Sequence, residues 1–516
     1  MSNGRRGLGP PHAAGEGVRQ SSGRGWGSDS GPESSRDFPL GRPLTPPGFQ
    51  TFRSPSHAPP IPMPLIASVS GIRGVFGDGL DPAVLVRFSS AFGAWLRSQT
   101  SGTPTVVVGR DGRVTGDVCA RLVTATLQSA GCDVVDVGLA TTPSVAMGVL
   151  KHDADGAVIL SASHNPAEWN ALKLLDGNGE FLGPDEGAAV LALAEDGAET
   201  QTVGYESLGR YRADDVLPYH VEKILDLPYI DADAIRQRGF KVIVDGINSV
   251  GAFAIPAILE ALGVEDVEVL NGEVNGLFAH NPEPLPAHIA GVTSRVAETG
   301  ADLGVIVDPD ADRLAFVEDG GRFLGEELTQ VVAADFILGK TPGPVGTNLS
   351  SSRLIEDVAR RHGQEVVRSS VGEIHVVRAM QEAGAVIGGE GNGGVILPDL
   401  HYGRDALVGV AIVLQHLAET GQSLSDVRAS YPRYAIAKHK VQLTAGMDAD
   451  ALLAALAERY RGGRVSTVDG VKVDLDEGWA HVRKSNTEPI LRVYTEAPTP
   501  EDADALAERF KAELLG

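Results

Sequence analysis

The chain has 516 residues, a formal net charge of −24 at pH 7 and two cysteines. Its length predicts roughly three or four domains, and the acidic charge argues against nucleic acid as a partner. No run of about 18 apolar residues is present, so no membrane span is expected. The spacing of Cys119 and Cys132 suits neither a zinc site nor a disulfide framework, which favours the reducing cytoplasm.

Residues 1–62 differ in kind from the rest of the chain. They are rich in Gly, Ser, Arg and Pro and show almost no apolar periodicity. Such a segment cannot bury enough apolar surface to offset the entropy of ordering, and it lacks the apolar region of a signal peptide. We therefore expect a disordered extension, which is either a genuine tail or a stretch upstream of a physiological start at Met63.

From Met63 the chain repeats an apolar strand, a polar loop and an amphipathic helix. Strands alternating with helices of about 10–15 residues predict parallel α/β units. The expected strands are residues 105–109, 132–138, 156–160, 240–246, 301–308 and 385–389. The expected helices begin near Asp117 and after Ser144, and then span residues 252–263 and 375–384.

The pattern changes after about Tyr431, where strand-like segments surround a helix at residues 448–460 and a final helix ends the chain. That order predicts a smaller α+β domain. The fold class expected is therefore α/β, with three similar α/β domains followed by this one. The expected domains are residues 63–208, 209–322, 323–431 and 432–516.

The stretch LSASHNPAEWNALKLL spans Leu160–Leu175, and Ser163 follows the end of an expected strand. Ligands bind at such strand ends in open α/β sheets. A serine in a polar turn is more often structural, because a nucleophilic serine needs a nearby base. We expect His164 to point away from Ser163 on an extended loop, whereas Lys173 could reach back. A Ser-His-Asp hydrolase would need a nucleophile elbow, which is absent.

The motif DPDADR places Asp308, Asp310 and Asp312 two residues apart after another expected strand. On an extended loop alternate side chains point the same way, and three carboxylates suit a hard cation such as Mg²⁺. An EF-hand is excluded because its sixth position, normally Gly, is Arg313. An acidic surface turn is the alternative to a metal site.

The stretch GGEGNGG, residues 388–394, contains the G-x-G-x-x-G pattern of dinucleotide sites. The residues that follow it do not predict a helix, and the pyrophosphate of a dinucleotide needs a helix N-terminus. We therefore reject a dinucleotide site. Glu390 and Asn392 suit hydrogen bonds to sugar hydroxyls, and the alternative is a flexible loop.

The stretch RKSNTEPILR, residues 483–492, combines two guanidinium groups, two hydroxyls and a turn. This combination favours a phosphate cradle, although it is not a Walker P-loop. The alternative is a hydrogen-bonded turn with solvated arginines. The candidate cradle residues are Arg483, Ser485, Asn486, Thr487 and Arg492.

Seven motifs together resemble the α-D-phosphohexomutase superfamily, which includes phosphoglucomutases, phosphomannomutases and phosphoglucosamine mutases. Besides the four stretches above, they are SGIRG (Ser70–Gly74), GRDGR (Gly109–Arg113) and TTP (Thr141–Pro143), all in the family's order. The resemblance covers about Met63 to Gly516. It implies three similar α/β domains with mixed sheets and a smaller fourth domain around a central cleft.

The resemblance also implies roles for individual residues. Ser163 would carry a phosphoryl group as phosphoserine and, with the three aspartates, would hold one Mg²⁺. Arg73 and Lys173 would lie beside the reacting centre. The substrate would contact His164, Arg313, Glu390 and Asn392, and the cradle residues would grip its non-reacting phosphate.

Two departures from the family pattern leave the acid/base group open. Many relatives have the tripeptide Ser-Gly-His in the loop that corresponds to residues 388–394, the sugar loop, and this tripeptide is absent here. Glu373 stands where some relatives have a His. Lys173 and Glu373 are therefore the candidates for the acid/base group. The motifs look most like those of phosphoglucosamine mutases.

The expected reaction interconverts a hexose 6-phosphate and a hexose 1-phosphate, with glucosamine 6-phosphate as the favoured substrate. A hexose 1,6-bisphosphate would be the intermediate and activator, and the enzyme would be a monomer or homodimer. A phosphomannomutase or phosphoglucomutase is the nearest alternative. A metal-dependent sugar phosphatase and a catalytically dead sugar-phosphate sensor are further ones.

Overall fold

The structure is a computed structural model that describes residues 65–68, 71–195, 202–444, 446–485 and 489–515. The expected disordered extension, residues 1–62, lies outside the described residues. Among the described helices, none has the length and apolar content needed to cross a membrane.

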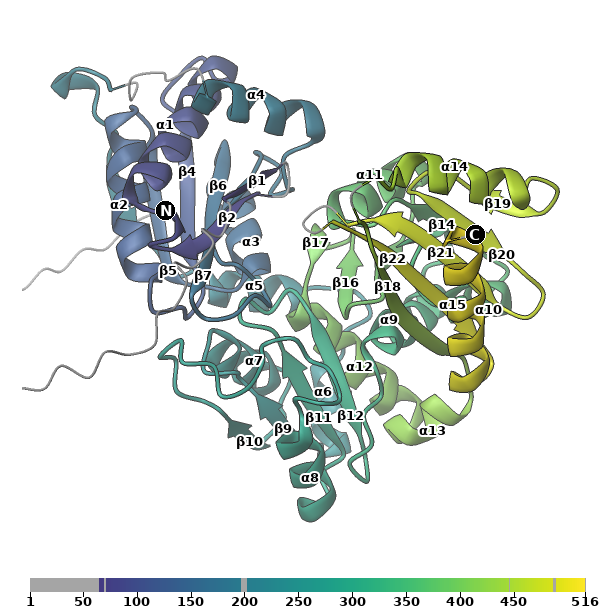
Figure 1. The fold of residues 1–516 in the computed structure, drawn as a ribbon. Coiled ribbons are helices and arrows are strands. Elements are labelled where there is room, and N and C mark those ends of the chain that lie inside the picture. Colours follow the sequence, from purple (N-terminus) through teal and green to yellow (C-terminus); the bar gives the residue numbers. More distant parts are fainter. Residues whose placement is uncertain (1–64, 69–70, 196–201, 445, 486–488, 516) are drawn as a thin grey trace, which may run out of the picture. The chain divides into compact units, whose positions relative to one another are not determined.

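The first sheet has eight strands in the order β1-β2-β7-β6-β4-β5-β8, with β3 paired to β2 (Figure 1). Its central pairs, β4–β6 and β4–β5, are parallel, while β6–β7 and β2–β7 are antiparallel, so the sheet is mixed. The strands are β1 (Ile66–Ser68), β2 (Gly71–Phe76), β3 (Gly79–Leu80), β4 (Thr105–Arg110), β5 (Asp133–Leu139), β6 (Gly156–Leu160), β7 (Trp169–Leu175) and β8 (Tyr211–Ala213).

Helices cover both faces of this sheet, which explains the unbroken apolar run in β4. Val106 and Val108 pack in one core cluster with residues of α1 (Pro82–Gln99) and α2 (Gly116–Ser129). Val107, between them, packs in another cluster with residues of α3 (Thr142–His152). Alternate side chains of a strand point to opposite faces, so a doubly covered strand is apolar throughout. Helix α4 (Pro184–Glu195) packs against α1.

The second sheet has the order β10-β9-β11-β12. Strand β9 is parallel to both β10 and β11, and β12 is antiparallel to β11. The strands are β9 (Lys241–Asp245), β10 (Asp266–Leu270), β11 (Leu303–Val307) and β12 (Leu314–Glu318). The helices of this region are α5 (Leu217–Leu225), α6 (Ala232–Arg238), α7 (Gly251–Ala261) and α8 (Ala290–Thr299), after the short 3₁₀ turn η1 (Tyr205–Ser207).

The third sheet has the order β14-β13-β15-β16-β17 and is again mixed. Its strands are β13 (Val345–Asn348), β14 (Val366–Ser369), β15 (Ile387–Glu390), β16 (Gly394–Leu397) and β17 (His401–Arg404). The helices are α9 (Glu326–Lys340), α10 (Leu354–Arg361), α11 (Glu373–Ala383), α12 (Ala406–Thr420) and α13 (Leu424–Ala429).

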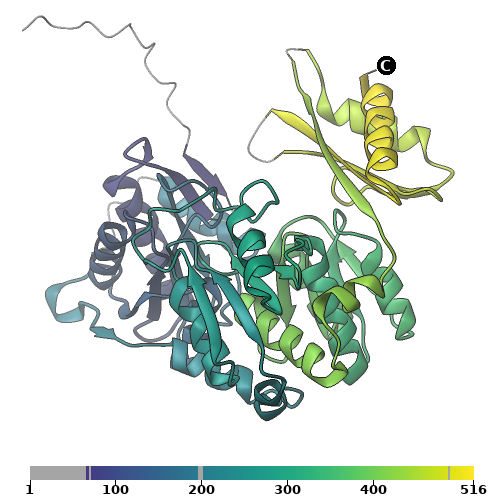
Figure 2. The same cartoon turned by 90° about the horizontal axis from the view of Figure 1, so that it is seen from below.

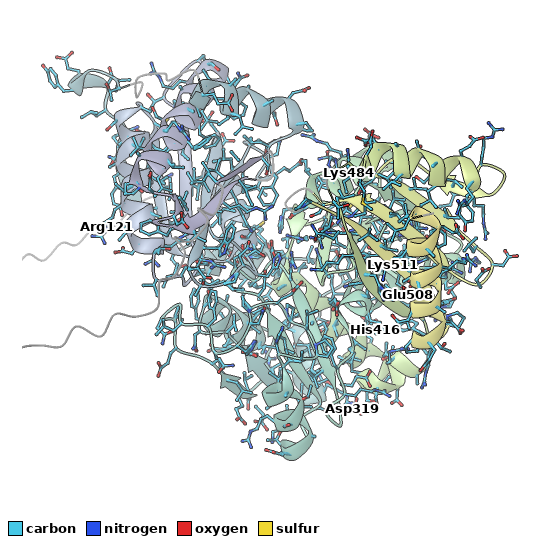
Figure 3. The ribbon with its side chains drawn as sticks, viewed as in Figure 1. Arg121, Asp319, His416, Lys484, Glu508 and Lys511 are labelled. Atoms are coloured by element: carbon cyan, nitrogen blue, oxygen red, sulfur yellow. The ribbon has the colours of Figure 1, made fainter. Side chains whose placement is uncertain are left out.

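The fourth sheet, β18-β22-β21-β20-β19, is antiparallel throughout. Its strands are β18 (Ala435–Gln442), β19 (Arg464–Ser466), β20 (Val471–Asp474), β21 (Trp479–Lys484) and β22 (Ile490–Ala497). Helix α15 (Pro500–Leu515) packs on it beside α14 (Ala449–Arg459) (Figure 2). Phe510 of α15 is fully buried, whereas Glu508 and Lys511 form an ion pair on its solvent side (Figure 3).

These sheets confirm the expected fold class of three mixed α/β domains and a smaller α+β domain. The domain boundaries themselves stay predictions, and the first sheet includes β8, which lies beyond residue 208. Three strands position the motifs identified in the sequence, because β6, β11 and β15 end at the serine, aspartate and glycine-rich motifs respectively. Strand ends in open α/β sheets are where ligands bind.

Candidate active site

Ser163 adopts a left-handed backbone conformation, with φ at +48°. Its hydroxyl donates to Oδ2 of Asp308 at 2.6 Å, and its Oγ lies 3.3 Å from Nδ1 of His164. The expectation that Ser163 and His164 point apart is therefore wrong. That expectation assumed an extended loop, whereas the positive φ turns both side chains to the same side.

The aspartates of the second domain converge, as expected. Asp308, Asp310 and Asp312 are each fully buried, and one carboxylate oxygen of each lies within 4.8 Å of the others. The alternative of an acidic surface turn is thus wrong. The reason we expected convergence is also wrong, because the segment is a tight turn with Ala311 at φ +51° and not an extended loop.

Two cations partly compensate the buried carboxylates. Nζ of Lys173 lies 2.6 Å from Oδ2 of Asp310, and Nη2 of Arg404 lies 2.7 Å from Oδ2 of Asp312. Burial works to raise the pKa of Asp312, but Arg404 and Lys173 hold it below its usual range. Burial and the neighbouring aspartates raise the pKa of Asp308 well above its usual range. Arg313 is the cation beside Asp308, with its Nε 4.0 Å from Asp308 Oδ2.

The donor set fits a divalent metal ion. Oδ1 of Asp310 and Oδ1 of Asp312 are buried and have no hydrogen-bond partner among the described residues. A buried carboxylate oxygen without a partner is costly, and a hard cation would satisfy both atoms. Ser163, bonded to Asp308, is placed to supply a further oxygen. The residues that would hold Mg²⁺ are thus the ones expected from the sequence.

A second buried cluster, His220, His401 and Asp405, is also compact enough for a metal. Here the carboxylate is already paired, because Oδ2 of Asp405 lies 2.8 Å from His220 Nε2 and 3.3 Å from His401 Nε2. Its Oδ1 accepts from two backbone N–H groups at the start of α12. Hydrogen bonds satisfy both oxygens of Asp405, and only Nδ1 of His401 lacks a partner among the described residues. The aspartate triad, with two partnerless carboxylate oxygens, is the better metal candidate.

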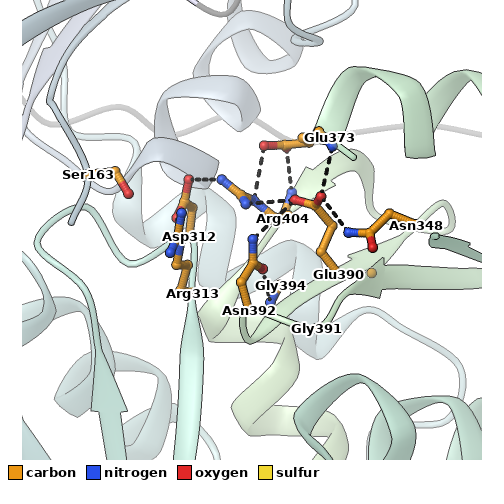
Figure 4. A network of polar contacts seen from close by, with 12 residues as sticks. Ser163, Asp312, Arg313, Asn348, Glu373, Glu390, Gly391, Asn392, Gly394 and Arg404 are labelled. Atoms are coloured by element: carbon orange, nitrogen blue, oxygen red, sulfur yellow. Dashed lines mark hydrogen bonds and ion pairs between the residues drawn. The ribbon is translucent and has the colours of Figure 1, made fainter. Parts of the chain in front are cut away.

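The glycine-rich stretch forms the tight connection between β15 and β16, and no helix follows it. The rejection of a dinucleotide site on this ground therefore agrees with the structure. Glu390 is 2 % exposed and accepts hydrogen bonds from Asn348 Nδ2 at 2.9 Å and from Gly372 N at 3.1 Å. Asn392 Nδ2 donates to the other carboxylate oxygen of Glu390 at 3.3 Å (Figure 4). The loop is thus a hydrogen-bonded element and not a loose one.

Arg404 is the site residue that sequence reasoning missed. Its guanidinium contacts three carboxylates: Asp312, Glu390 at 2.9 Å and Glu373 at 3.1 Å (Figure 4). It joins the aspartate turn of the second domain to the glycine-rich loop of the third, residues 388–394. The only sequence signal is its position at the end of β17, directly before the α12 cap residue Asp405.

Glu373 and Lys173, the acid/base candidates, differ in their surroundings. Burial raises the pKa of Glu373, opposed by Arg404. Burial works to lower the pKa of Lys173, but Asp310 and Asp312 hold it above its usual value. Lys173 is thus a protonated cation, whereas Glu373 is a buried carboxyl group that contacts Arg404 at 3.1 Å. Burial and the neighbouring Arg313 lower the pKa of His164 far below its usual value, so its imidazole is neutral.

A cavity of about 630 Å³ brings most of the candidate residues together. The candidates that line it are Arg73, Ser163, His164, Lys173, Arg313, Glu373, Glu390 and Asn392, joined by Arg404. Arg73 of β2 lies opposite Ala171 of β7, two residues from Lys173, so both cations project from one face of the first sheet. The three aspartates lie beneath the cavity wall, bonded to Ser163 and Lys173.

The described cradle residues do not line that cavity. They lie in the fourth sheet, where Arg483 of β21 is directly opposite Arg492 of β22. Ser485 N donates to Ile490 O at 3.0 Å, and Arg492 Nη2 donates to Ser485 Oγ at 3.4 Å. Asn486 and Thr487, also expected in the cradle, lie outside the described residues, as does Ser70 of the first motif.

Four family profiles match the chain in succession. They describe phosphoglucomutase/phosphomannomutase α/β/α domain I over residues 65–201, domain II over 218–321, domain III over 325–434 and the C-terminal domain over 439–513. The chain belongs to the phosphoglucomutase/phosphomannomutase family. This confirms the resemblance to the α-D-phosphohexomutases.

Relatives span nearly the whole of this phosphohexomutase. A phosphoglucomutase/phosphomannomutase from Thermococcus kodakarensis is 37% identical over 84% of this chain and 94% of its own length. A phosphoglucosamine/phosphogalactosamine mutase from Sulfurisphaera tokodaii is 31% identical over 86% of this chain and 98% of its own length. A crystal structure of a phosphoglucomutase/phosphomannomutase family protein from Burkholderia thailandensis matches with a TM-score of 0.76 at 28% identity. The match covers 87% of this chain and 96% of that protein.

Proposed function

We propose that this phosphohexomutase interconverts hexose 6-phosphate and hexose 1-phosphate through a phosphoserine at Ser163, with glucosamine phosphate as its preferred substrate. One observation carries the proposal. The Ser163 hydroxyl lies 2.6 Å from Asp308 and lines the same cavity as the sugar loop residues Glu390 and Asn392. The proposed phosphoryl carrier and the proposed hydroxyl-binding residues thus line one cavity of about 630 Å³, and the proposed metal ligands lie directly behind Ser163.

In the proposed reaction the free hydroxyl oxygen of a hexose monophosphate attacks the phosphorus of phosphorylated Ser163. The new sugar O–P bond forms, the Ser163 Oγ–P bond breaks, and the product is a hexose 1,6-bisphosphate. The reverse step, after the bisphosphate has turned round, returns the other phosphoryl group to Ser163. Phosphoryl transfer depends mainly on positioning and on neutralising charge on the transferred group.

The chain's own residues meet those demands. Arg73, Lys173 and Arg313 supply positive charge around the cavity. Mg²⁺ bound by Asp308, Asp310 and Asp312 would supply further charge neutralisation for the phosphoryl oxygens.

Glu373 is the better of the two base candidates. A general base must accept the proton of the attacking hydroxyl and return it on the reverse step. Lys173 already carries its proton, held there by Asp310 and Asp312. The Glu373 carboxyl lines the cavity, and burial raises its pKa. A cavity carboxyl whose pKa is perturbed in this way is a candidate for a catalytic group.

The candidate group for binding the substrate's second phosphate lies in the fourth sheet. Arg483 of β21 lies directly opposite Arg492 of β22, so the two side chains project from the same face of the sheet. Two neighbouring guanidinium groups can bind one phosphate through charge-assisted hydrogen bonds. We assign this pair, with Ser485, to the non-reacting phosphate of the substrate.

Substrate preference rests on two supports. The motifs look most like those of phosphoglucosamine mutases, and the Sulfurisphaera tokodaii relative is named for glucosamine and galactosamine phosphates. The comparable identity of the Thermococcus kodakarensis phosphoglucomutase/phosphomannomutase makes that the second candidate function. Values of kcat/KM for glucosamine, glucose and mannose 6-phosphates decide between them, and at least about tenfold preference for glucosamine is expected.

The mutase is separated from a sugar phosphatase by intact-protein mass spectrometry. The mutase predicts a species heavier by about 80 Da, one HPO₃, localised to Ser163 and lost on mixing with hexose monophosphate. A phosphatase would instead release inorganic phosphate and would need no bisphosphate activator. Release of phosphate in step with substrate loss, without isomerised product, would overturn the proposal.

A further inference from the structure

Arg113 is a charged residue that is almost completely buried, with 1 % of its surface exposed. Its guanidinium lies beneath the turn that carries Ser163 and donates to four backbone carbonyls of that turn. Nη1 donates to Pro166 O at 2.6 Å and to Trp169 O at 3.0 Å. Nη2 donates to Asn165 O at 2.8 Å and to the carbonyl oxygen of Ser163 itself.

The fifth donor of this guanidinium is also used. Nε of Arg113 donates to Oδ2 of Asp111 at 2.9 Å, and the backbone N–H of Arg113 donates to Oδ1 of the same carboxylate. An arginine side chain has five N–H donors in a fixed planar fork. All five have a partner here, and four of the partners are carbonyls between residues 163 and 169. Arg113 is thus matched to one arrangement of this turn.

The turn needs such support because its central residue is strained. Left-handed backbone costs a non-glycine residue on the order of 1–2 kcal/mol and persists only where its surroundings determine it. Ser163 has φ +48°, and this conformation directs its hydroxyl toward Asp308. Arg113 holds the carbonyl that follows the Ser163 Cα, so it fixes the peptide plane on that side of the serine.

The Arg113 side chain also adds no net charge to the site. Asp111 is fully buried beside Arg113, so the two form a neutral ion pair. The ring of Phe278, from the second domain, faces the guanidinium at 5.0 Å. Arg73, Lys173 and Arg313 are therefore the residues that would neutralise charge on the transferred phosphoryl group. Arg113 would affect only the position of the turn that carries Ser163.

We infer that Arg113 is a positioning residue, which sets the orientation of the phosphoryl-carrying Ser163 through its backbone. The inference rests on the proposed phosphoserine mechanism. A lysine at this position keeps the charge but has three donors on one nitrogen, so it cannot span four carbonyls and Asp111. A small misplacement of a reacting group costs on the order of 10²-fold in rate.

The test compares the wild-type enzyme with R113K and with R295K. Arg295 of α8 makes a two-donor contact to Glu268 on the protein surface, and its change to lysine is the matched control. We expect R113K to lower kcat by about 10²-fold, with KM within about threefold of wild type. The phosphoryl group on Ser163 of R113K should pass to substrate correspondingly more slowly. R295K should match wild type in both measurements.

Hydrogen exchange supplies a readout that does not depend on activity. Backbone amides of a peptide covering residues 160–170 should exchange faster in R113K than in wild type, while peptides of the fourth domain should be unchanged. If R113K does not fold, D111N weakens the anchor of Arg113 and should show a smaller effect in the same direction. Exchange equal to wild type, or kcat within threefold of it, in a folded variant overturns the inference.

The two proposals fail separately. If wild-type protein carries no phosphoserine at any stage of turnover, the proposed mechanism is wrong, and with it the positioning role. If wild type behaves as proposed and R113K does too, only the role of Arg113 is wrong.

Discussion

Nη2 of Arg404 lies 2.7 Å from Oδ2 of Asp312, although the two residues belong to regions with different sheets: Arg404 ends β17, and Asp312 lies between β11 and β12. The same guanidinium lies 2.9 Å from Glu390 in the sugar loop. One buried cation therefore connects the aspartate turn to Glu390. Its position would link the proposed metal site to the proposed sugar site, although the two motifs are separate in the sequence.

Replacing Arg404 by lysine should reduce kcat/KM by about 10²-fold or more, because breaking a buried ion pair costs on the order of 3 kcal/mol. An ammonium group cannot contact Asp312, Glu373 and Glu390 together. Steady-state kinetics with R360K as control checks this, since Arg360 is 72% exposed on α10. R404K with kcat/KM within threefold of wild type contradicts the role assigned to this residue.

The convergence of Ser163, Asp308 and Glu390 could be predicted from the sequence. Each follows an apolar strand within a repeating α/β pattern, and strand ends of such sheets collect ligand-binding residues. The residue types then limit the possible substrates. A serine can carry a phosphoryl group, three carboxylates suit a hard cation, and polar side chains on a glycine-rich loop suit sugar hydroxyls. Local pattern was sufficient to place these residues, although not to predict the left-handed backbone at Ser163 and Ala311.

The remaining features depend on contacts between segments far apart in the chain. The positive φ of Ser163 was not predictable because serine ordinarily avoids it, and Arg113, 50 residues earlier, helps to hold it. Arg404 could not be predicted as a site residue because a single arginine at the end of a short strand belongs to no recognisable motif. Its importance comes from the carboxylates that tertiary structure brings around it.

Replacing Ser163 by alanine should abolish turnover and remove the species heavier by about 80 Da. Binding of hexose phosphate should persist, because the sugar loop and the fourth-domain arginines do not contact the Ser163 hydroxyl in any hydrogen bond seen among the described residues. Calorimetric titration with glucosamine 6-phosphate, beside activity, checks both parts. S129A, at the exposed end of α2, is the control. Turnover above about a tenth of wild type in S163A would show that another residue carries the phosphoryl group.

Removing Mg²⁺ with EDTA should abolish activity, and adding it back should restore activity. Replacing Asp310 by asparagine should weaken Mg²⁺ binding at least tenfold, because one of three anionic ligands becomes neutral. Isothermal titration with MgCl₂ measures the affinity directly, independent of turnover. E298Q removes a carboxylate that is 66% exposed on α8 and should bind Mg²⁺ as wild type does. Equal affinity in D310N would place the metal elsewhere.

Acid should weaken the contact between the third and fourth domains at His481. This side chain is 1 % exposed; its Nε2 donates to Asp469 O at 2.6 Å and its Nδ1 accepts from Ser350 Oγ at 2.8 Å. Burial lowers the pKa of His481 to about 4, against about 6.5 in an unfolded chain. Between those two pH values the unfolded chain binds the proton more readily than the folded one. The stabilisation is therefore complete above about pH 6.5 and is lost progressively as the pH falls toward 4.

The loss expected from this one group is on the order of 2–3 kcal/mol. Replacing His481 by glutamine removes the titrating group, so H481Q should be less stable than wild type at pH 7.5, and the difference should shrink as the pH approaches 4. Thermal unfolding midpoints of both proteins, measured at half-unit steps, give this difference. H439Q serves as the control because His439 lies in the same sheet, where its Nε2 is hydrogen-bonded to Asp504. A wild-type minus H481Q difference that stays constant from pH 7.5 to 4 would mean that His481 is not held neutral in the folded protein.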